Sequence, residues 1–99
     1  MTYNSFLSAG LVDPKLHQAI ANHPDSIKMQ RLLTQALELR ILHQISLVAD
    51  ESFKKEAIKT ALNTQSWTDF YEGIKKKNSN FAQNLTESVK RLQFALLNS

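Results

Sequence analysis

Hydrophobic side chains recur along this chain at the three-to-four-residue spacing of amphipathic helices, and short polar breaks separate the repeating segments. The pattern predicts about five helices. In chain order, the predicted helices cover approximately residues 14–23, 25–48, 50–62, 66–77 and 79–97. We therefore expect an all-α fold, a compact bundle with a long central helix and a long C-terminal helix. Residues 1–12 form either a further helical turn or an arm that packs on the bundle.

Residues that commonly begin and end helices lie at the borders of these segments. Asp13 and Pro14 suit a helix start, because an aspartate accepts hydrogen bonds from free N–H groups and proline needs no partner there. Pro24 ends the first helix, since it forces the residue before it out of the helical region. Ser66 and Asp69 have the spacing of a capping box, in which each side chain accepts a hydrogen bond from the other residue's N–H. These signals support the predicted borders.

The long segment at about 25–48 is apolar over well over half of its circumference. Its hydrophobic residues are Met29, Leu32, Leu33, Ala36, Leu37, Leu39, Ile41, Ile45, Leu47 and Val48. A surface helix needs an apolar stripe only about 100° wide, so we expect this helix to be central. Its neighbours or another chain would then cover it on several sides. Arg40 and His43 fall within the same apolar sector.

The last segment, at about 79–97, has a regular apolar stripe with two exceptions. The stripe contains Phe81, Leu85, Ser88, Val89, Leu92, Ala95 and Leu96. Phe94 and Leu97 point away from it, and Phe94 lies nearly opposite Leu85 on the helix. These two large apolar residues therefore lie outside the core that the stripe predicts.

Length and composition limit the class of protein. With 99 residues and 42% hydrophobic content, the chain is predicted to form one domain, residues 1–99, with a single core. Cysteine is absent, which excludes disulfides, thiolate metal sites and a cysteine nucleophile. The first twelve residues lack the features of a secretory signal, and no segment has the roughly 20 apolar residues of a membrane span. We expect a cytoplasmic protein with no membrane partner.

The sequence contains no motif of a catalytic or nucleotide-binding site. It has no G-x-S-x-G elbow, no phosphate-binding lysine loop, no dinucleotide glycine fingerprint and no H-E-x-x-H pair. Two glycines, Gly10 and Gly73, are too few for a phosphate cradle. His17 and His23 project from different sides of a helix, whereas paired metal ligands lie one turn apart. We expect no enzymatic activity, no cofactor and no metal site.

A nucleic-acid partner is the alternative that the charge supports. The net charge is +3, and residues 54–76 resemble a degenerate helix-turn-helix. Its phosphate contacts would come from Lys54, Lys55, Lys75, Lys76 and Lys77. Asp69 and Glu72 would approach the same phosphates, so this interpretation ranks second. The run of lysines at 75–77 also suits a helix C-terminus, where cations oppose the negative end of the dipole.

Three aromatic residues, Trp67, Phe70 and Tyr71, fall within one narrow arc of their predicted helix. Such an arc usually belongs to a core. It is also the geometry of a platform on which bases or a ligand stack. The sequence leaves both interpretations open.

Some hydrophobic residues lie outside the core-facing stripes of their helices. These residues predict a protein partner. The candidate interface joins the long helix to the end of the last one, through Leu39, Arg40, His43, Leu47, Phe94 and Leu97. Exposed apolar area usually marks an interface. Arg40 within it suits either an inter-chain carboxylate pair or a side chain at the end of the bundle whose charged group reaches the surface. The alternatives are a long helix covered by its own neighbours and a frayed C-terminus. We expect a non-enzymatic interaction module, such as an adaptor, an inhibitor or a chaperone-like protein, that also self-associates, for example as a dimer.

Overall fold

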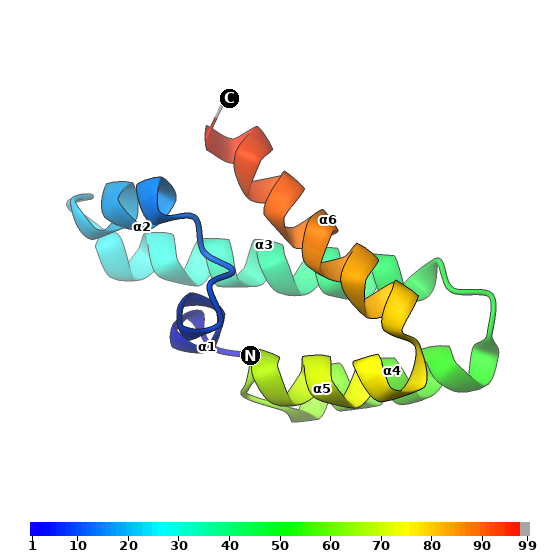
Figure 1. Cartoon of the computed structure of the whole chain (residues 1–99). Coiled ribbons are helices and arrows are strands. Elements are labelled where there is room, and N and C mark those ends of the chain that lie inside the picture. Colours follow the sequence, from blue (N-terminus) through cyan, green and yellow to red (C-terminus); the bar gives the residue numbers. More distant parts are fainter. Residues whose placement is uncertain (98–99) are drawn as a thin grey trace.

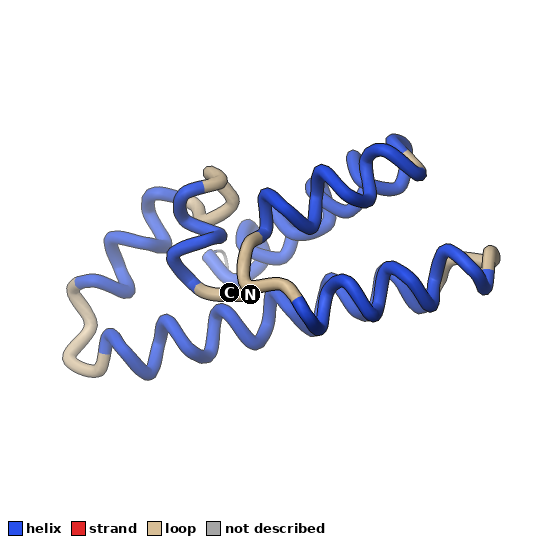
Figure 2. The backbone as a smooth tube through the Cα atoms, turned by 90° about the horizontal axis from the view of Figure 1, so that it is seen from below, coloured by secondary structure: helices blue, strands red, loops and turns tan. Residues whose placement is uncertain are grey.

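The computed structural model describes residues 1–97, which form six helices joined by short turns (Figure 1, Figure 2). The helices are α1 (Tyr3–Ser8), α2 (Pro14–Ala21), α3 (Ser26–Ser46), α4 (Glu51–Asn63), α5 (Trp67–Lys77) and α6 (Ser79–Leu97). This confirms the predicted all-α bundle with a long α3 and a long C-terminal α6. The sixth helix is α1, the further helical turn considered for residues 1–12. No helix within the described chain is both long and apolar enough to cross a membrane.

The other helices are arranged around α3. In the view of Figure 1, α6 crosses in front of α3, α1, α4 and α5 lie below it, and α2 lies along its N-terminal half. α3 contacts α1, α2, α4 and α6, while α5 packs mainly on α6. The prediction that the long helix is central is therefore confirmed, although its neighbours cover only part of its circumference.

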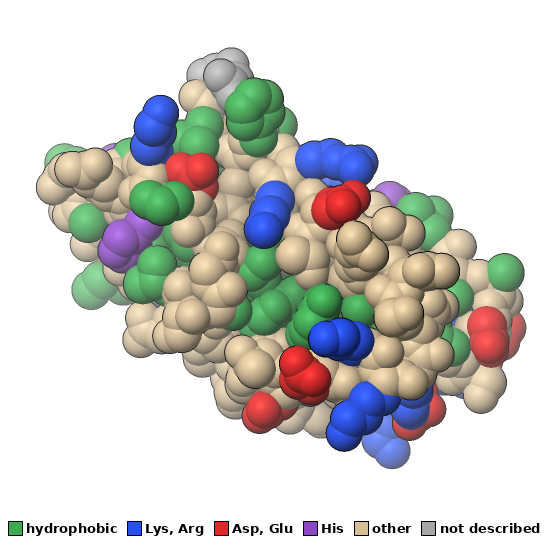
Figure 3. All heavy atoms as spheres, in the orientation of Figure 1, with side chains coloured by type: hydrophobic (Ala, Val, Ile, Leu, Met, Phe, Trp, Pro, Cys, Tyr) green, Lys and Arg blue, Asp and Glu red, His purple; other side chains and the backbone are tan. Residues whose placement is uncertain are grey.

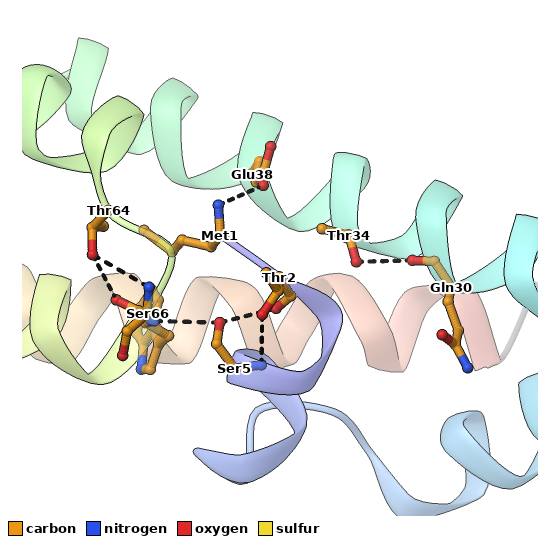
Figure 4. Close-up of polar contacts among 9 residues, drawn as sticks. Met1, Thr2, Ser5, Gln30, Thr34, Glu38, Thr64 and Ser66 are labelled. Atoms are coloured by element: carbon orange, nitrogen blue, oxygen red, sulfur yellow. Dashed lines mark hydrogen bonds and ion pairs between the residues drawn. The ribbon is translucent and has the colours of Figure 1, made fainter.

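Several helices begin as the sequence predicts. Asp13 and Asp50 each accept hydrogen bonds from backbone N–H groups in the first turns of α2 and α4. The hydroxyl of Ser66 accepts one from the N–H of Asp69, 3.3 Å away, at the start of α5. The second half of the predicted capping box is not formed, because the N–H of Ser66 donates to Oγ1 of Thr64 instead (Figure 4).

The core lies between α3 and the helices that surround it. Its buried hydrophobic residues are Tyr3, Phe6, Leu11, Val12, Ile20, Leu33, Leu37, Ile41, Ile45, Ala57, Trp67, Phe70, Ile74, Ala82, Leu85 and Val89. α3 contributes four of them at a strict four-residue spacing, and we call Leu33, Leu37, Ile41 and Ile45 the inner row. Fully burying a side chain of this size contributes about 1.5–3 kcal/mol. One side of α3 therefore faces the core.

The aromatic arc of α5 belongs to this core. Trp67 and Phe70 are buried, and the ring of Trp67 lies 5.8 Å from the rings of Phe70 and Tyr71, measured between centroids. The ring of Phe6 in α1 covers Trp67 from another side, at 6.0 Å. Of the two interpretations of the arc, the structure supports the core.

The end of α6 departs from its predicted stripe. Gln93 is buried, whereas Ala95 and Leu96, which the stripe includes, are exposed. The side-chain oxygen of Gln93 accepts a hydrogen bond from the N–H of Asp13 at 2.7 Å, and its amide donates to the carbonyl of Leu11. The stripe fails at this end because the segment that packs there is the α1–α2 connection, whose backbone requires a polar partner.

The first residues are tied to α3 and to the α4–α5 turn (Figure 4). The amino group of Met1 lies 2.9 Å from Oε1 of Glu38 in α3. The hydroxyl of Ser5 accepts a hydrogen bond from the backbone N–H of Trp67, 3.3 Å away. These contacts make α1 part of the bundle and occupy the one carboxylate that α3 carries.

Candidate protein-interaction surface

The side of α3 that faces away from the core carries a second set of mainly apolar residues. We call this set the outer stripe, and it consists of Leu32, Ala36, Leu39 and His43 of α3 together with Leu47, the C-cap residue that follows directly. Its members follow one another after three or four residues, so they lie along one side of the helix. At 3.6 residues per turn, Leu32 and Leu39 lie roughly 160–180° from Ile41 of the inner row. Leu39 is 67% and Leu47 66% exposed.

The charged residues of α3 nearest the outer stripe are cations, one on each side. Lys28 and Arg40 each lie about 60° around the helix from the centre of the stripe, on opposite sides of it. Arg31 lies further round on the side of Lys28. Within residues 1–97, none of these three cations makes an ion pair. The acidic residue of α3, Glu38, is turned away and pairs with the N-terminal amine. The charged side chains of α3 that flank the stripe are therefore positive.

A shallow hollow beside the outer stripe extends the apolar surface towards α4. Its volume is about 90 Å³, and it is lined by Met1, Glu38, Ile41, Leu42, Ala61 and Leu62. Leu42 lies one turn from Leu39 on α3, and Leu62 of α4 contributes to the other wall. Leu62 itself faces away from the core. It is 68% exposed because it lies roughly 140° around α4 from the buried Ala57.

The predicted interface residues of α6 lie on a separate surface. Phe94 is 70% and Leu97 37% exposed. Both follow Gln93, where α6 meets the α1–α2 connection, at the end of α6 that projects beyond α3 (Figure 1). Figure 3 shows hydrophobic side chains gathered at this projecting end of α6. The structure therefore leaves Arg40 half-buried, exposes the other residues of the predicted interface and divides the set between two surfaces. Leu39, Arg40, His43 and Leu47 lie on or beside the outer stripe.

Two lysines of the nucleic-acid alternative are paired within the molecule. The Nζ atom of Lys54 lies 2.9 Å from Oε1 of Glu51, one turn earlier on α4. Lys77 at the end of α5 pairs with Glu56 of α4. Beneath this pair, a groove of about 240 Å³ separates the two helices. A phosphate would have to compete with both carboxylates for these cations.

The other three lysines of this alternative are exposed. The Nζ atom of Lys75 lies 6.0 Å from the ring centroid of Tyr71, while Lys55 and Lys76 project from α4 and α5. Figure 3 shows acidic side chains next to basic ones over this end of the molecule. The field there is mixed, as the sequence suggested, and nucleic-acid binding stays a prediction.

Two histidines take part in local hydrogen bonds. The phenol oxygen of Tyr3 and Nδ1 of His17 lie 2.6 Å apart, and burial raises the pKa of Tyr3. Nδ1 of His23 accepts a hydrogen bond from the N–H of Asp25, 2.9 Å away, in the turn before α3. In the part of the chain that the structure describes, no three histidine or acidic side chains lie close enough together to hold a metal ion.

Comparison with known proteins adds no family to this description. No protein-family model matches the chain, and no curated protein or solved structure is similar enough to it to count as a match. The candidate surface is therefore argued from its geometry.

Proposed function

We propose that this chain is a non-enzymatic helical module that binds another protein through the outer stripe of α3. The observation that carries the proposal is a row of exposed leucines, Leu32, Leu39 and Leu47, on a helix whose inner row is buried. Single exposed apolar side chains are common on monomers, but a continuous apolar surface usually marks an interface. Removing such a row from water contributes about 25 cal/mol per Å² of apolar surface.

The spacing of the outer stripe suits a partner helix. Leu32, Ala36, Leu39 and His43 are separated by four, three and four residues, which is the spacing of the seam between two helices that lie along one another. The small side chain of Ala36 leaves room for a larger side chain of the partner. From Leu32 to Leu47 the stripe is about 22 Å long, which matches a partner helix of about four turns.

A display library of helical peptides tests the proposal. It is panned against the wild-type protein, and the enriched peptides are then measured against the Leu32→Gln/Leu39→Gln variant. We expect these peptides to carry apolar residues at three- and four-residue spacing and to bind the variant at least tenfold more weakly, because central apolar anchors dominate interface energies.

The matched control changes the other exposed surface. Phe94→Gln/Leu97→Gln removes a similar apolar area from α6 and should leave peptide binding unchanged. Thermal unfolding of both variants verifies that each is folded. Peptides that bind the wild type and the outer-stripe variant equally well, or that lose binding only in the α6 variant, would contradict the proposal.

Self-association, which the sequence led us to expect, is measured with the same proteins. Sedimentation equilibrium over a concentration series, on the wild type and both variants, assigns any dimer to one of the two surfaces. A dimer lost only in the α6 variant would place self-association at Phe94 and Leu97 and leave the outer stripe to a different protein. A dimer lost only in the outer-stripe variant would make a second copy the occupant of the stripe.

A further inference from the structure

We infer that the partner of the outer stripe is an acidic amphipathic helix, an inference that rests on the proposed function. The charges that flank the stripe support this inference. Lys28 and Arg40 lie on its two sides, Arg31 lies beyond Lys28, and Glu38 is already paired with the N-terminal amine. A helix docked on this surface therefore meets positive charge on both of its edges.

Within residues 1–97, an ion pair neutralises only some of the lysines and arginines. On α4, α5 and α6, acidic neighbours neutralise Lys54, Lys77 and Arg91. The three cations around the outer stripe have no such neighbour within residues 1–97. Opposite charges on a partner guide its approach and fix its register. The missing carboxylates are thus expected on the partner.

Arg40 favours a carboxylate as the acidic group that the partner brings to this surface. Its side chain is half-buried beside the stripe, so the aliphatic part can pack while the guanidinium stays at the surface. A planar guanidinium binds both oxygens of a carboxylate, which a lysine ammonium does not do. We therefore place a glutamate of the partner opposite Arg40, and a second one opposite Lys28.

Other occupants fit this surface less well. A second copy docked by its own outer stripe would bring Lys28, Arg31 and Arg40 of both chains to one interface, with no unpaired acidic residue of α3 to balance them. A membrane surface favours a broad apolar face with aromatic residues, whereas the outer stripe is a single row without an aromatic side chain. An acidic helix matches both the row and its charges.

Three synthetic helical peptides test the inference. They share one leucine seam, spaced like the outer stripe, and carry glutamate, glutamine or lysine at the positions that flank it. Binding is measured by fluorescence anisotropy at low and at high salt. We expect the glutamate peptide to bind about tenfold more tightly than the glutamine peptide, and the lysine peptide to bind most weakly. High salt should reduce these differences, because exposed charges are screened.

Charge reversal on the protein provides the decisive variant. Lys28→Glu/Arg40→Glu should invert the order, so that the lysine peptide binds best. Lys55→Glu/Lys76→Glu makes the same change in charge on α4 and α5 and should leave the order intact. An inversion confined to the first variant would support the inference.

The remaining outcomes separate this inference from the function it rests on. Equal binding of the three peptides would overturn the acidic partner while the proposed function stands. Library peptides that bind through the outer stripe without an excess of acidic residues would do the same. Binding to anionic phospholipid vesicles that is lost in Lys28→Glu/Arg40→Glu, with no peptide bound, would assign the surface to a membrane and overturn both. Failure of all peptides together with an outer-stripe dimer would overturn the acidic partner in favour of a second copy.

Discussion

α3 presents a row of aliphatic residues on each of two opposite sides. The inner row is at most 6% exposed, whereas Leu32 and Leu39 of the outer stripe are 47% and 67% exposed. The inner row advances by four residues each time and so drifts around the helix, as suits a neighbour that crosses it, such as α6. The outer stripe has one step of three among its steps of four and so drifts less around the helix, as suits a helix lying along it. The spacing, rather than the composition, distinguishes the two sides.

The largest expected difference in stability is between a leucine-to-alanine substitution on the inner side of α3 and the same substitution on its outer side. Leu37→Ala should lower the free energy of unfolding by about 2–5 kcal/mol, since it leaves a cavity in the core. Leu39→Ala, two residues further on, should change it by less than about 0.5 kcal/mol. Urea denaturation measures both. Similar losses at the two positions would show that the outer stripe is part of the core.

Replacing a buried glutamine is expected to lower the stability of the fold, whereas replacing an exposed one is not. Gln93→Ala should cost roughly 1–3 kcal/mol, because it leaves the N–H of Asp13 and the carbonyl of Leu11 without their partner. The matched control is Gln35→Ala on the exposed side of α3, which should have little effect. Denaturation curves compare the two variants. Equal stabilities would contradict the role given to Gln93.

The starts of α3 and α4 offer a smaller contrast. Asp50→Ala should cost about 1 kcal/mol, because Asp50 caps α4 through the N–H of Phe53, 3.1 Å away. Asp25→Ala should cost less, since no side-chain hydrogen bond caps the start of α3. Thermal unfolding measures the difference. A larger loss for Asp25 would mean that α3 depends on its end more than on its inner row.

The smallest expected effect is a pH dependence at Tyr3, which is buried near the inner side of α3. Burial disfavours the phenolate, so the pKa of Tyr3 lies above its ordinary value of 10.0 in the folded protein. The stability that the neutral phenol provides is complete below pH 10.0 and is lost as the pH rises through the folded pKa. Tyr3→Phe should therefore lose less stability than the wild type between neutral and strongly alkaline pH. Parallel losses in the two proteins would contradict this.

The sequence predicted most of the fold because helix borders depend on local chemistry. Asp13, Asp50 and Ser66 mark helix starts through hydrogen bonds to their own first turns. The burial of Gln93 escaped prediction for a tertiary reason. Whether a position is buried depends on which distant segment meets it, and the α1–α2 connection at Gln93 leaves no trace in the helical pattern.

The candidate surface was predictable in part. The spacing of Leu39, His43 and Leu47 was visible in the sequence, but Leu32 and the flanking Lys28 join them only once the inner row is known. Phe94 was assigned to the same interface because its helical pattern does not record the direction in which α6 crosses α3. The pairing of Glu38 with the N-terminal amine, which leaves the charged side chains of α3 that flank the stripe positive, also depends on the tertiary fold.

The most direct test of two functionally different sides of α3 is methyl NMR of the leucine residues during titration with the tightest-binding peptide of the library. We expect shifts at Leu32, Leu39 and Leu47, smaller ones at Leu42 and Leu62, and none at Leu33 or Leu37. Shifts spread over the inner row, or confined to Leu97, would contradict this expectation.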